Sequence, residues 1–140
     1  MISIATILFI EKKMAVSFII MTNNPLVRDR YRGQYSVEYQ DGVYMDLLVR
    51  VRDKVHAGHK LLTHPLSGSV KPNETPYKSV MISQKRGTMD LESLSIIEEA
   101  IVACRKFPVK YDGLPQRVLE DFQLVDLTLI DSAIPSASAF

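Results

Sequence analysis

Continuous apolar runs and segments of helical spacing alternate along the first half of the chain. Met14 to Met21 is apolar except at Ser17 and rich in β-branched residues, which predicts a strand buried on both faces. Asn24 is a good helix N-cap and Pro25 suits the first helical position, so a short helix should follow. Tyr35 to Tyr39 alternates apolar and polar side chains, which indicates a second strand.

The next segment has the spacing of an amphipathic helix. From Val43 to His56 apolar residues recur every three or four positions, and Gly58 provides a C-terminal stop. Lys60 to Thr63 predicts a third strand. This alternation is typical of a three-layer α/β fold, and we expect a mainly parallel sheet of four to five strands with helices on both faces. The helix should bury Tyr44, Leu47, Leu48, Val51 and Val55.

The second half predicts three further elements and an ambiguous one. Tyr77 to Ser83 reads as a strand, a helix capped by Thr88 or Asp90 follows, and Pro115 to Phe122 predicts a short helix. The alternation from Val125 to Leu129 favours an edge strand, with a helical continuation as the alternative. The helix after Asp90 should bury Leu91, Leu94, Ile97, Ile101 and Cys104.

Length and composition indicate one globular domain. The chain has 140 residues, 46% of them hydrophobic and 24% charged. We expect an N-terminal extension at residues 1–13, a single α/β domain at 14–134 and a tail at 135–140. Met14 is an alternative translation start, which an intact-mass measurement would decide. Neither apolar run near the N-terminus approaches the ~20 residues of a spanning helix.

Charge and cysteine content narrow the class of partner. The formal net charge is +1, which argues against nucleic acid and acidic membranes as partners. A single cysteine, Cys104, excludes an internal disulfide and suits a cytoplasmic protein. Its position on an apolar helix face favours a buried, inert thiol. The sequence indicates no particular cofactor.

Two polar segments form the candidate site. In a parallel sheet the Thr22–Pro25 turn and the long loop from His64 to Ser79 should open on the same edge, where ligands bind in α/β folds. Three prolines stiffen the loop, which argues against a loose linker. The candidate ligand-binding residues are Thr22, Asn23, Asn24, Ser67, Gly68, Ser69, Lys71, Asn73, Glu74 and Lys78.

The three histidines suggest two weaker hypotheses, a catalytic residue and a metal site. His64 follows a strand and is the candidate general acid or base, although a structural hydrogen bond across the loop is the favoured interpretation. His56, His59 and His64 lie close in sequence, but there is no cysteine nearby and Glu74 is the only acid in the loop. We therefore predict no metal site.

Three segments together resemble the GrdX family: TNNP at Thr22–Pro25, GHKLLTHPLSGSVKPNETPYKS at Gly58–Ser79, and DLESLSIIEEAI at Asp90–Ile101. The resemblance covers roughly Phe18 to Phe107. Genes of this family lie in clusters that encode the glycine, sarcosine and betaine reductases of amino-acid-fermenting anaerobes. The resemblance implies a cytoplasmic anaerobic setting, but it supplies no reaction and no catalytic residues.

Three functional hypotheses follow. The first is an accessory protein of these reductases that binds a small polar or anionic ligand. The second is a small enzyme acting on an acyl phosphate or thioester, with His64 as acid or base and Lys71 or Lys78 stabilising negative charge. The third is a protein-interaction or assembly module for a reductase subunit. A dimer through the expected edge strand is conceivable, and the sequence leaves the oligomeric state open.

Overall fold

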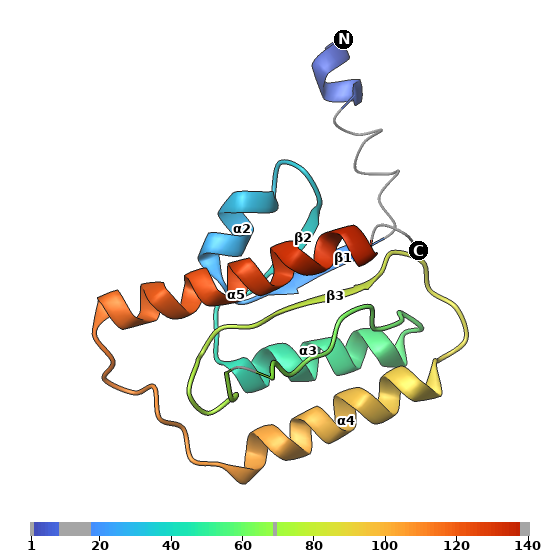
Figure 1. Ribbon diagram of the computed structural model, residues 1–140. Helices are drawn as coiled ribbons and strands as arrows, with labels where there is room; N and C mark the ends of the chain where they lie inside the picture. Colours follow the sequence, from blue (N-terminus) through green and yellow to red (C-terminus); the bar gives the residue numbers. More distant parts are fainter. Residues whose placement is uncertain (1, 9–17, 69, 138–140) are drawn as a thin grey trace.

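A three-stranded mixed sheet lies between two pairs of helices in the computed structural model, which describes residues 2–8, 18–68 and 70–137 (Figure 1). The strands are β1 (Phe18–Thr22), β2 (Ser36–Tyr39) and β3 (Ser79–Ser83), in the order β2-β1-β3. The helices are α2 (Pro25–Tyr31), α3 (Tyr44–His56), α4 (Leu91–Lys106) and α5 (Gln116–Ala137), and residues 4–8 form a further short helix.

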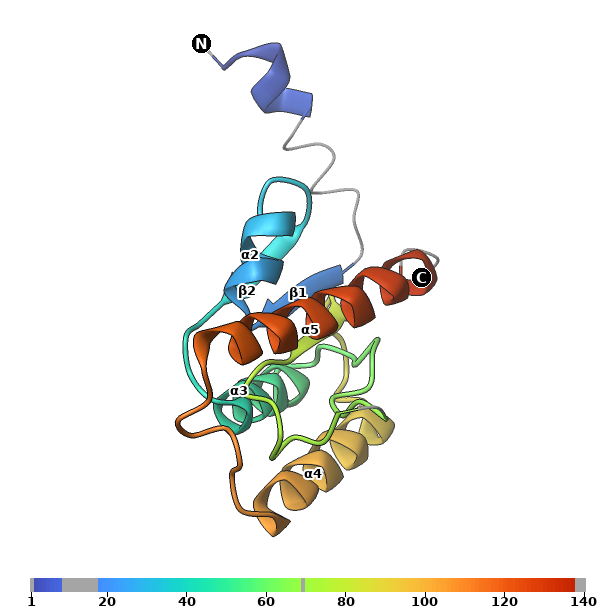
Figure 2. The same cartoon turned by 60° about the vertical axis from the view of Figure 1, so that its left-hand side comes forward.

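Helices α3 and α4 cover one face of the sheet, whereas α2 and α5 cover the other (Figures 1 and 2). Because side chains alternate along a strand, β1 contributes to both cores. Ile19 and Met21 pack in the α3/α4 core, and Phe18 and Ile20 in the α2/α5 core. All five residues of β1 are buried, as its apolar run predicts for a central strand.

The expected sheet of four to five mainly parallel strands is wrong. β1 pairs with β2 in parallel, but it pairs with β3 antiparallel, with Thr22 opposite Ser79. A parallel neighbour needs a crossover that returns the chain to the opposite edge of the sheet. The loop before β3 instead delivers the chain to the edge where β1 ends, so β3 must run back along it.

Two of the expected strands are also corrected. Leu61 makes only an isolated antiparallel bridge to Ile82, so residues 60–63 are not a full strand. The segment Val125–Leu129 is helical and belongs to α5. Its alternation is misleading because Val125 and Leu129 are apolar residues on an exposed part of the helix, 40% and 36% exposed, whereas Asp126 is buried.

The ends of the expected domain fall partly outside the described residues. Residues 9–17 and 138–140 are not described, so the hypotheses about Met14 and about the start of the first strand lie outside the structure. At the other end, α5 continues to Ala137, which is 2% exposed and packs in the α2/α5 core. Residues 135–137, expected in the tail, are therefore helical.

Candidate functional site

The end of β1 and the start of β3 are joined by a buried pair of hydroxyls. The Oγ1 atom of Thr22 lies 2.7 Å from the Oγ atom of Ser79, and both residues are buried. The same Thr22 oxygen accepts a hydrogen bond from the backbone N–H of Asn24 at 2.9 Å. Thr22 therefore turns the chain at the end of the strand and fixes the point where the long loop returns to the sheet.

Asn23 holds the C-terminal part of the loop in place. Its side-chain amide donates to the carbonyl oxygens of Gly42 (3.0 Å) and Pro76 (2.6 Å), and its Oδ1 atom accepts from the backbone N–H of Lys78 (2.9 Å). Both ends of this amide are therefore used in binding the protein's own backbone.

Asn24 joins the first helix to the last. Its Oδ1 atom accepts from the N–H of Leu26 and caps α2, as the sequence predicts. Its Nδ2 atom donates to the carbonyl of Gln123 and to a carboxylate oxygen of Asp126, both at 2.9 Å. The turn thus meets the end of the loop, but its polar side chains bind other parts of the chain.

Asp126 is the residue at this junction that the sequence analysis did not identify. Its carboxylate accepts hydrogen bonds from Asn24 Nδ2 (2.9 Å), Ser79 N (2.9 Å) and Ser79 Oγ (2.7 Å), and the residue is 4% exposed. Asp126 could have been identified if the segment that contains Val125–Leu129 had been interpreted as a helix. Asp126, Ile130 and Ile134 then share one face, and a lone acid on an apolar helix face needs buried partners.

Lys78 is the second buried ionisable group. It is 7% exposed, and its Nζ atom donates to Ser67 Oγ at 2.7 Å. Burial lowers the pKa of Lys78, and the negative charge of Asp126 partly opposes this change. Burial raises the pKa of Asp126, against the opposing effect of its hydrogen bonds with Asn24 and Ser79. Each environment therefore shifts its group towards the neutral form, a pattern common at functional sites.

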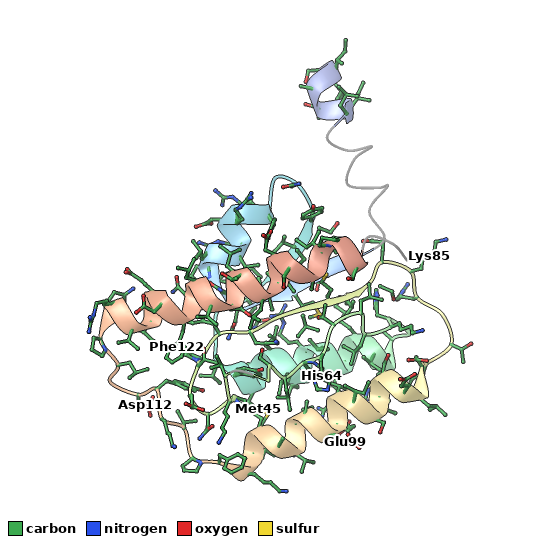
Figure 3. All side chains as sticks on the ribbon, in the orientation of Figure 1. Met45, His64, Lys85, Glu99, Asp112 and Phe122 are labelled. Atoms are coloured by element: carbon green, nitrogen blue, oxygen red, sulfur yellow. The ribbon has the colours of Figure 1, made fainter. Side chains whose placement is uncertain are left out.

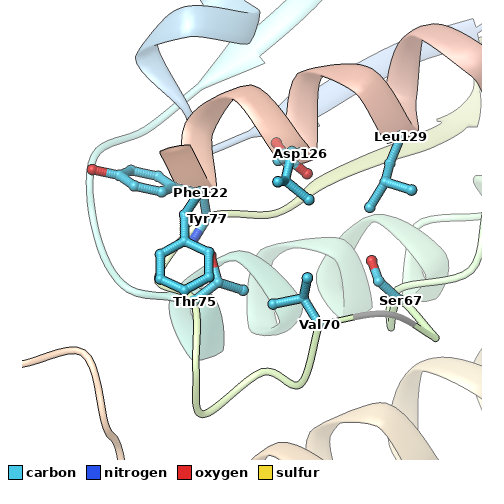
Figure 4. Close-up of a pocket in the computed structure, with 8 residues that line it drawn as sticks. Ser67, Val70, Thr75, Tyr77, Phe122, Asp126 and Leu129 are labelled. Carbon is cyan, nitrogen blue, oxygen red and sulfur yellow. The ribbon is translucent and has the colours of Figure 1, made fainter. Parts of the chain in front are cut away.

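A small pocket lies between the loop and α5 (Figure 4). Its volume is about 10 Å³, close to the smallest space that holds one water molecule. Phe122, Val125 and Leu129 of α5 provide apolar walls, and Asp126 lies between them on the same helix. The loop contributes Ser67, Val70, Thr75 and Tyr77.

The other predicted site residues lie elsewhere on the loop. Gly68, Lys71 and Glu74 are exposed and do not line the pocket. Asn73 is 4% exposed, and its amide donates to the carbonyl of Pro108 at 3.2 Å. Ser69 lies outside the described residues.

The histidines are placed singly. His64 is exposed on the loop, and its Nδ1 atom accepts from the N–H of Leu66 at 3.0 Å, within its own turn (Figure 3). His59 Nδ1 lies 2.7 Å from the carbonyl of Ser83. Within the described ranges, no group of three or more His, Cys, Asp or Glu side chains could hold a metal ion.

Replacing Asn23 with alanine should loosen the loop. The change leaves the buried N–H of Lys78 without its acceptor and removes a donor from the carbonyls of Gly42 and Pro76, so we expect the free energy of unfolding to fall by about 1–3 kcal/mol. Hydrogen exchange of the Lys78 amide should also accelerate. Asn73→Ala is the matched control, because Asn73 donates one side-chain hydrogen bond and its buried Oδ1 has no partner among the described residues. Equal losses in the two variants would contradict the assigned role of Asn23.

Comparisons with known proteins identify the family. No helix in the described part of the chain is long and apolar enough to cross a membrane. No curated protein and no solved structure matches the chain. A family model described as GrdX-like protein matches residues 19–135, which include both polar segments and Asp126. The chain therefore belongs to the GrdX-like protein family.

Proposed function

We propose that this chain is an accessory protein of the glycine, sarcosine and betaine reductase system and that it binds a small polar or anionic ligand between the loop and α5. Membership of the GrdX-like family supports the first part, because the family takes its name from that system. A subunit of one of these reductases is the macromolecular partner that the association implies. The cytoplasm of an anaerobe that ferments amino acids is the setting that goes with it.

The observation that carries the ligand proposal is the burial of Lys78 beside the pocket. An ammonium group has three N–H donors, and among the described residues the Nζ atom of Lys78 binds Ser67 alone. No described carboxylate forms an ion pair with it. Asp126, the buried acid whose charge acts on Lys78, already accepts three hydrogen bonds. An anion next to Lys78 would therefore supply the missing countercharge and further acceptors.

The proposal gives a role to five of the ten predicted ligand-binding residues. Ser67 and Lys78 are the proposed ligand contacts, because Ser67 lines the pocket and holds the Lys78 side chain there. Thr22, Asn23 and Asn24 are proposed to position the loop, because their side chains bind other residues of the chain.

Lys78→Met should abolish ligand binding. In a thermal-shift series with phosphate, acetyl phosphate, glycine and nucleotides, a ligand at a hundredfold excess over its Kd stabilises the protein by about 2.7 kcal/mol. For a domain of this size that corresponds to a rise in Tm of roughly 5–10 °C. The rise should vanish in Lys78→Met and persist in Lys71→Met, which changes an exposed lysine of the same loop.

Two results would contradict the ligand proposal. One is the absence of a Tm shift with all four compounds at millimolar concentration. The other is a shift of the same size in wild type and Lys78→Met.

A further inference from the structure

The contact between Ser67 and Lys78 has the geometry of a nucleophile and its base. The Ser67 Oγ and Lys78 Nζ atoms are 2.7 Å apart, although the residues are eleven positions apart in the chain. The backbone around Lys78 is fixed on both sides. Its own N–H donates to Asn23 Oδ1 at 2.9 Å, and the N–H of the next residue, Ser79, donates to Asp126 Oδ1 at 2.9 Å. The backbone on both sides of Lys78 is therefore fixed, and the Lys78 amine lies next to the Ser67 hydroxyl.

The environment of Lys78 shifts its pKa towards the form that can accept a proton. Burial is the largest influence on its pKa and lowers it, while Asp126 is the charged group that acts in the opposite direction. A neutral amine has a lone pair, so the hydrogen bond can run from the Ser67 hydroxyl to Nζ. Lysines of this kind serve as general bases in enzymes.

The Ser67 side chain can also be reached from solvent, because the residue is only half-buried. It lines the pocket together with apolar groups, including Val70 of the loop and Leu129 of α5 (Figure 4). The pocket itself has room for about one water molecule, so a short acyl chain would contact these apolar groups from the solvent side. The next residue, Gly68, is exposed, and a Cβ atom built on it would meet nothing within 4 Å. An acyl group can therefore approach Ser67 from the loop side.

We propose that Ser67 and Lys78 form a serine–lysine catalytic dyad that transfers the acyl group of a small thioester to water. Dyads of serine and lysine are a known variant of the serine triad. The proposal rests on the pocket of the proposed function, but it requires a neutral Lys78 rather than a bound anion.

The reaction balances with water as the only co-substrate. Ser67 Oγ attacks the acyl carbon while its proton passes to Lys78 Nζ, and the carbon–sulfur bond breaks. The leaving thiolate takes the proton from Lys78 and departs as a thiol, which leaves an ester on Ser67. A water molecule then attacks the ester carbon and gives a proton to Lys78. The bond to Ser67 Oγ breaks, Oγ recovers the proton, and a carboxylic acid is released.

Covalent trapping tests the dyad. The full chain is treated with a small alkyl fluorophosphonate, which reacts with activated serines, and the adduct is located by peptide mass spectrometry. We expect one adduct, on Ser67, and none in Ser67→Ala. Lys78→Met should slow labelling by about 10²–10⁴-fold, the usual contribution of a general base. Lys71→Met and His64→Ala should label at the wild-type rate, because both side chains are exposed and do not line the pocket.

Two further measurements cover the case in which Lys78→Met folds poorly. Lys78→Arg keeps a cation but cannot accept a proton near neutral pH, so it should be as slow as the methionine variant. In the wild type the labelling rate should rise with pH and level off below 10.5, since burial lowers the Lys78 pKa from that value. No adduct, an adduct on another residue, or a rate that does not depend on Lys78 or on pH would overturn the dyad.

The dyad and the ligand proposal fail in different ways. A Tm shift with an anion but no adduct on Ser67 would overturn the dyad alone. An adduct on Ser67 without any Tm shift would overturn the ligand proposal alone.

Discussion

Asp126→Ala is expected to lower the free energy of unfolding by about 3–5 kcal/mol, because it removes a buried acceptor of three hydrogen bonds. Three hydrogen bonds from Asn24 and Ser79 end on this carboxylate. The substitution leaves the backbone N–H of Ser79 without its acceptor, removes one acceptor each from Asn24 Nδ2 and Ser79 Oγ, and removes the negative charge that acts on Lys78. It also removes the hydrogen bonds that join α5 to the start of β3 at Ser79.

Urea denaturation of wild type and variant measures this loss. Asp121→Ala is the matched control, because Asp121 is an exposed acid on the same helix, and the change should stay within about 0.5 kcal/mol. A loss below about 1 kcal/mol in Asp126→Ala would mean that the hydrogen bonds of Asp126 do not hold α5 to the sheet.

Gly58→Ala should lower the free energy of unfolding by a comparable amount, because it strains the backbone. Gly58 has φ +104°, a conformation that side-chain-bearing residues rarely adopt, and an added Cβ atom would lie 2.2 Å from the carbonyl oxygen of Gly87. Positive φ costs about 1–3 kcal/mol and overpacking a further 1–3 kcal/mol, so we expect a total loss of about 2–6 kcal/mol. The backbones of Gly58 and Gly87 approach closely in the turn after α3, where the Gly87 N–H donates to the Gly58 carbonyl at 2.9 Å.

The opposite glycine provides the control for this substitution. A Cβ atom on Gly87 meets nothing within 4 Å, and Gly87 is not among the glycines with positive φ. Gly87→Ala should therefore leave the midpoint of denaturation almost unchanged. Similar midpoints for Gly58→Ala and Gly87→Ala would show that the turn relaxes to admit a side chain.

Local sequence patterns predicted individual elements well. α2 begins with Asn24 as N-cap and Pro25 in its first turn, as expected. The predicted buried face of α3 is confirmed in full: Tyr44, Leu47, Leu48, Val51 and Val55 are all at most 1% exposed. In α4, Ile97 and Ile101 are buried, but Leu91 is 71% exposed because it occupies the first position of the helix, beyond the edge of the core.

The pairing of strands was not predictable in the same way. Period and composition describe one segment at a time, whereas the direction of β3 depends on the path of the preceding loop. The C-terminal error has a related cause. A five-residue window with alternating polarity fits a strand, and only the longer spacing of Asp126, Ile130 and Ile134 reveals the buried face of a helix.

The two polar segments meet for a reason that the sequence analysis did not give. The sequence places Thr22–Asn24 and the loop at one edge because both should follow parallel strands. In the structure, Asn23 instead binds Pro76 and Lys78 at the end of the loop, because the antiparallel strand β3 begins where β1 ends. The sequence does not show that the Asn23 side chain binds the backbone of Pro76 and Lys78, because these residues are more than fifty positions away in the chain. The role of the two polar segments in binding a ligand stays a proposal.

The dependence of the core on α5 has a consequence for synthesis on the ribosome. The α2/α5 core includes Ile130 and Ile134, and the network around Ser79 includes Asp126, all of them near the C-terminus. A growing chain that has not yet released α5 exposes one apolar face of its sheet and leaves Asn24 and Ser79 without their acceptor. The protein should therefore reach its native state only after α5 has left the ribosome, and nascent chains that lack α5 should be bound by chaperones.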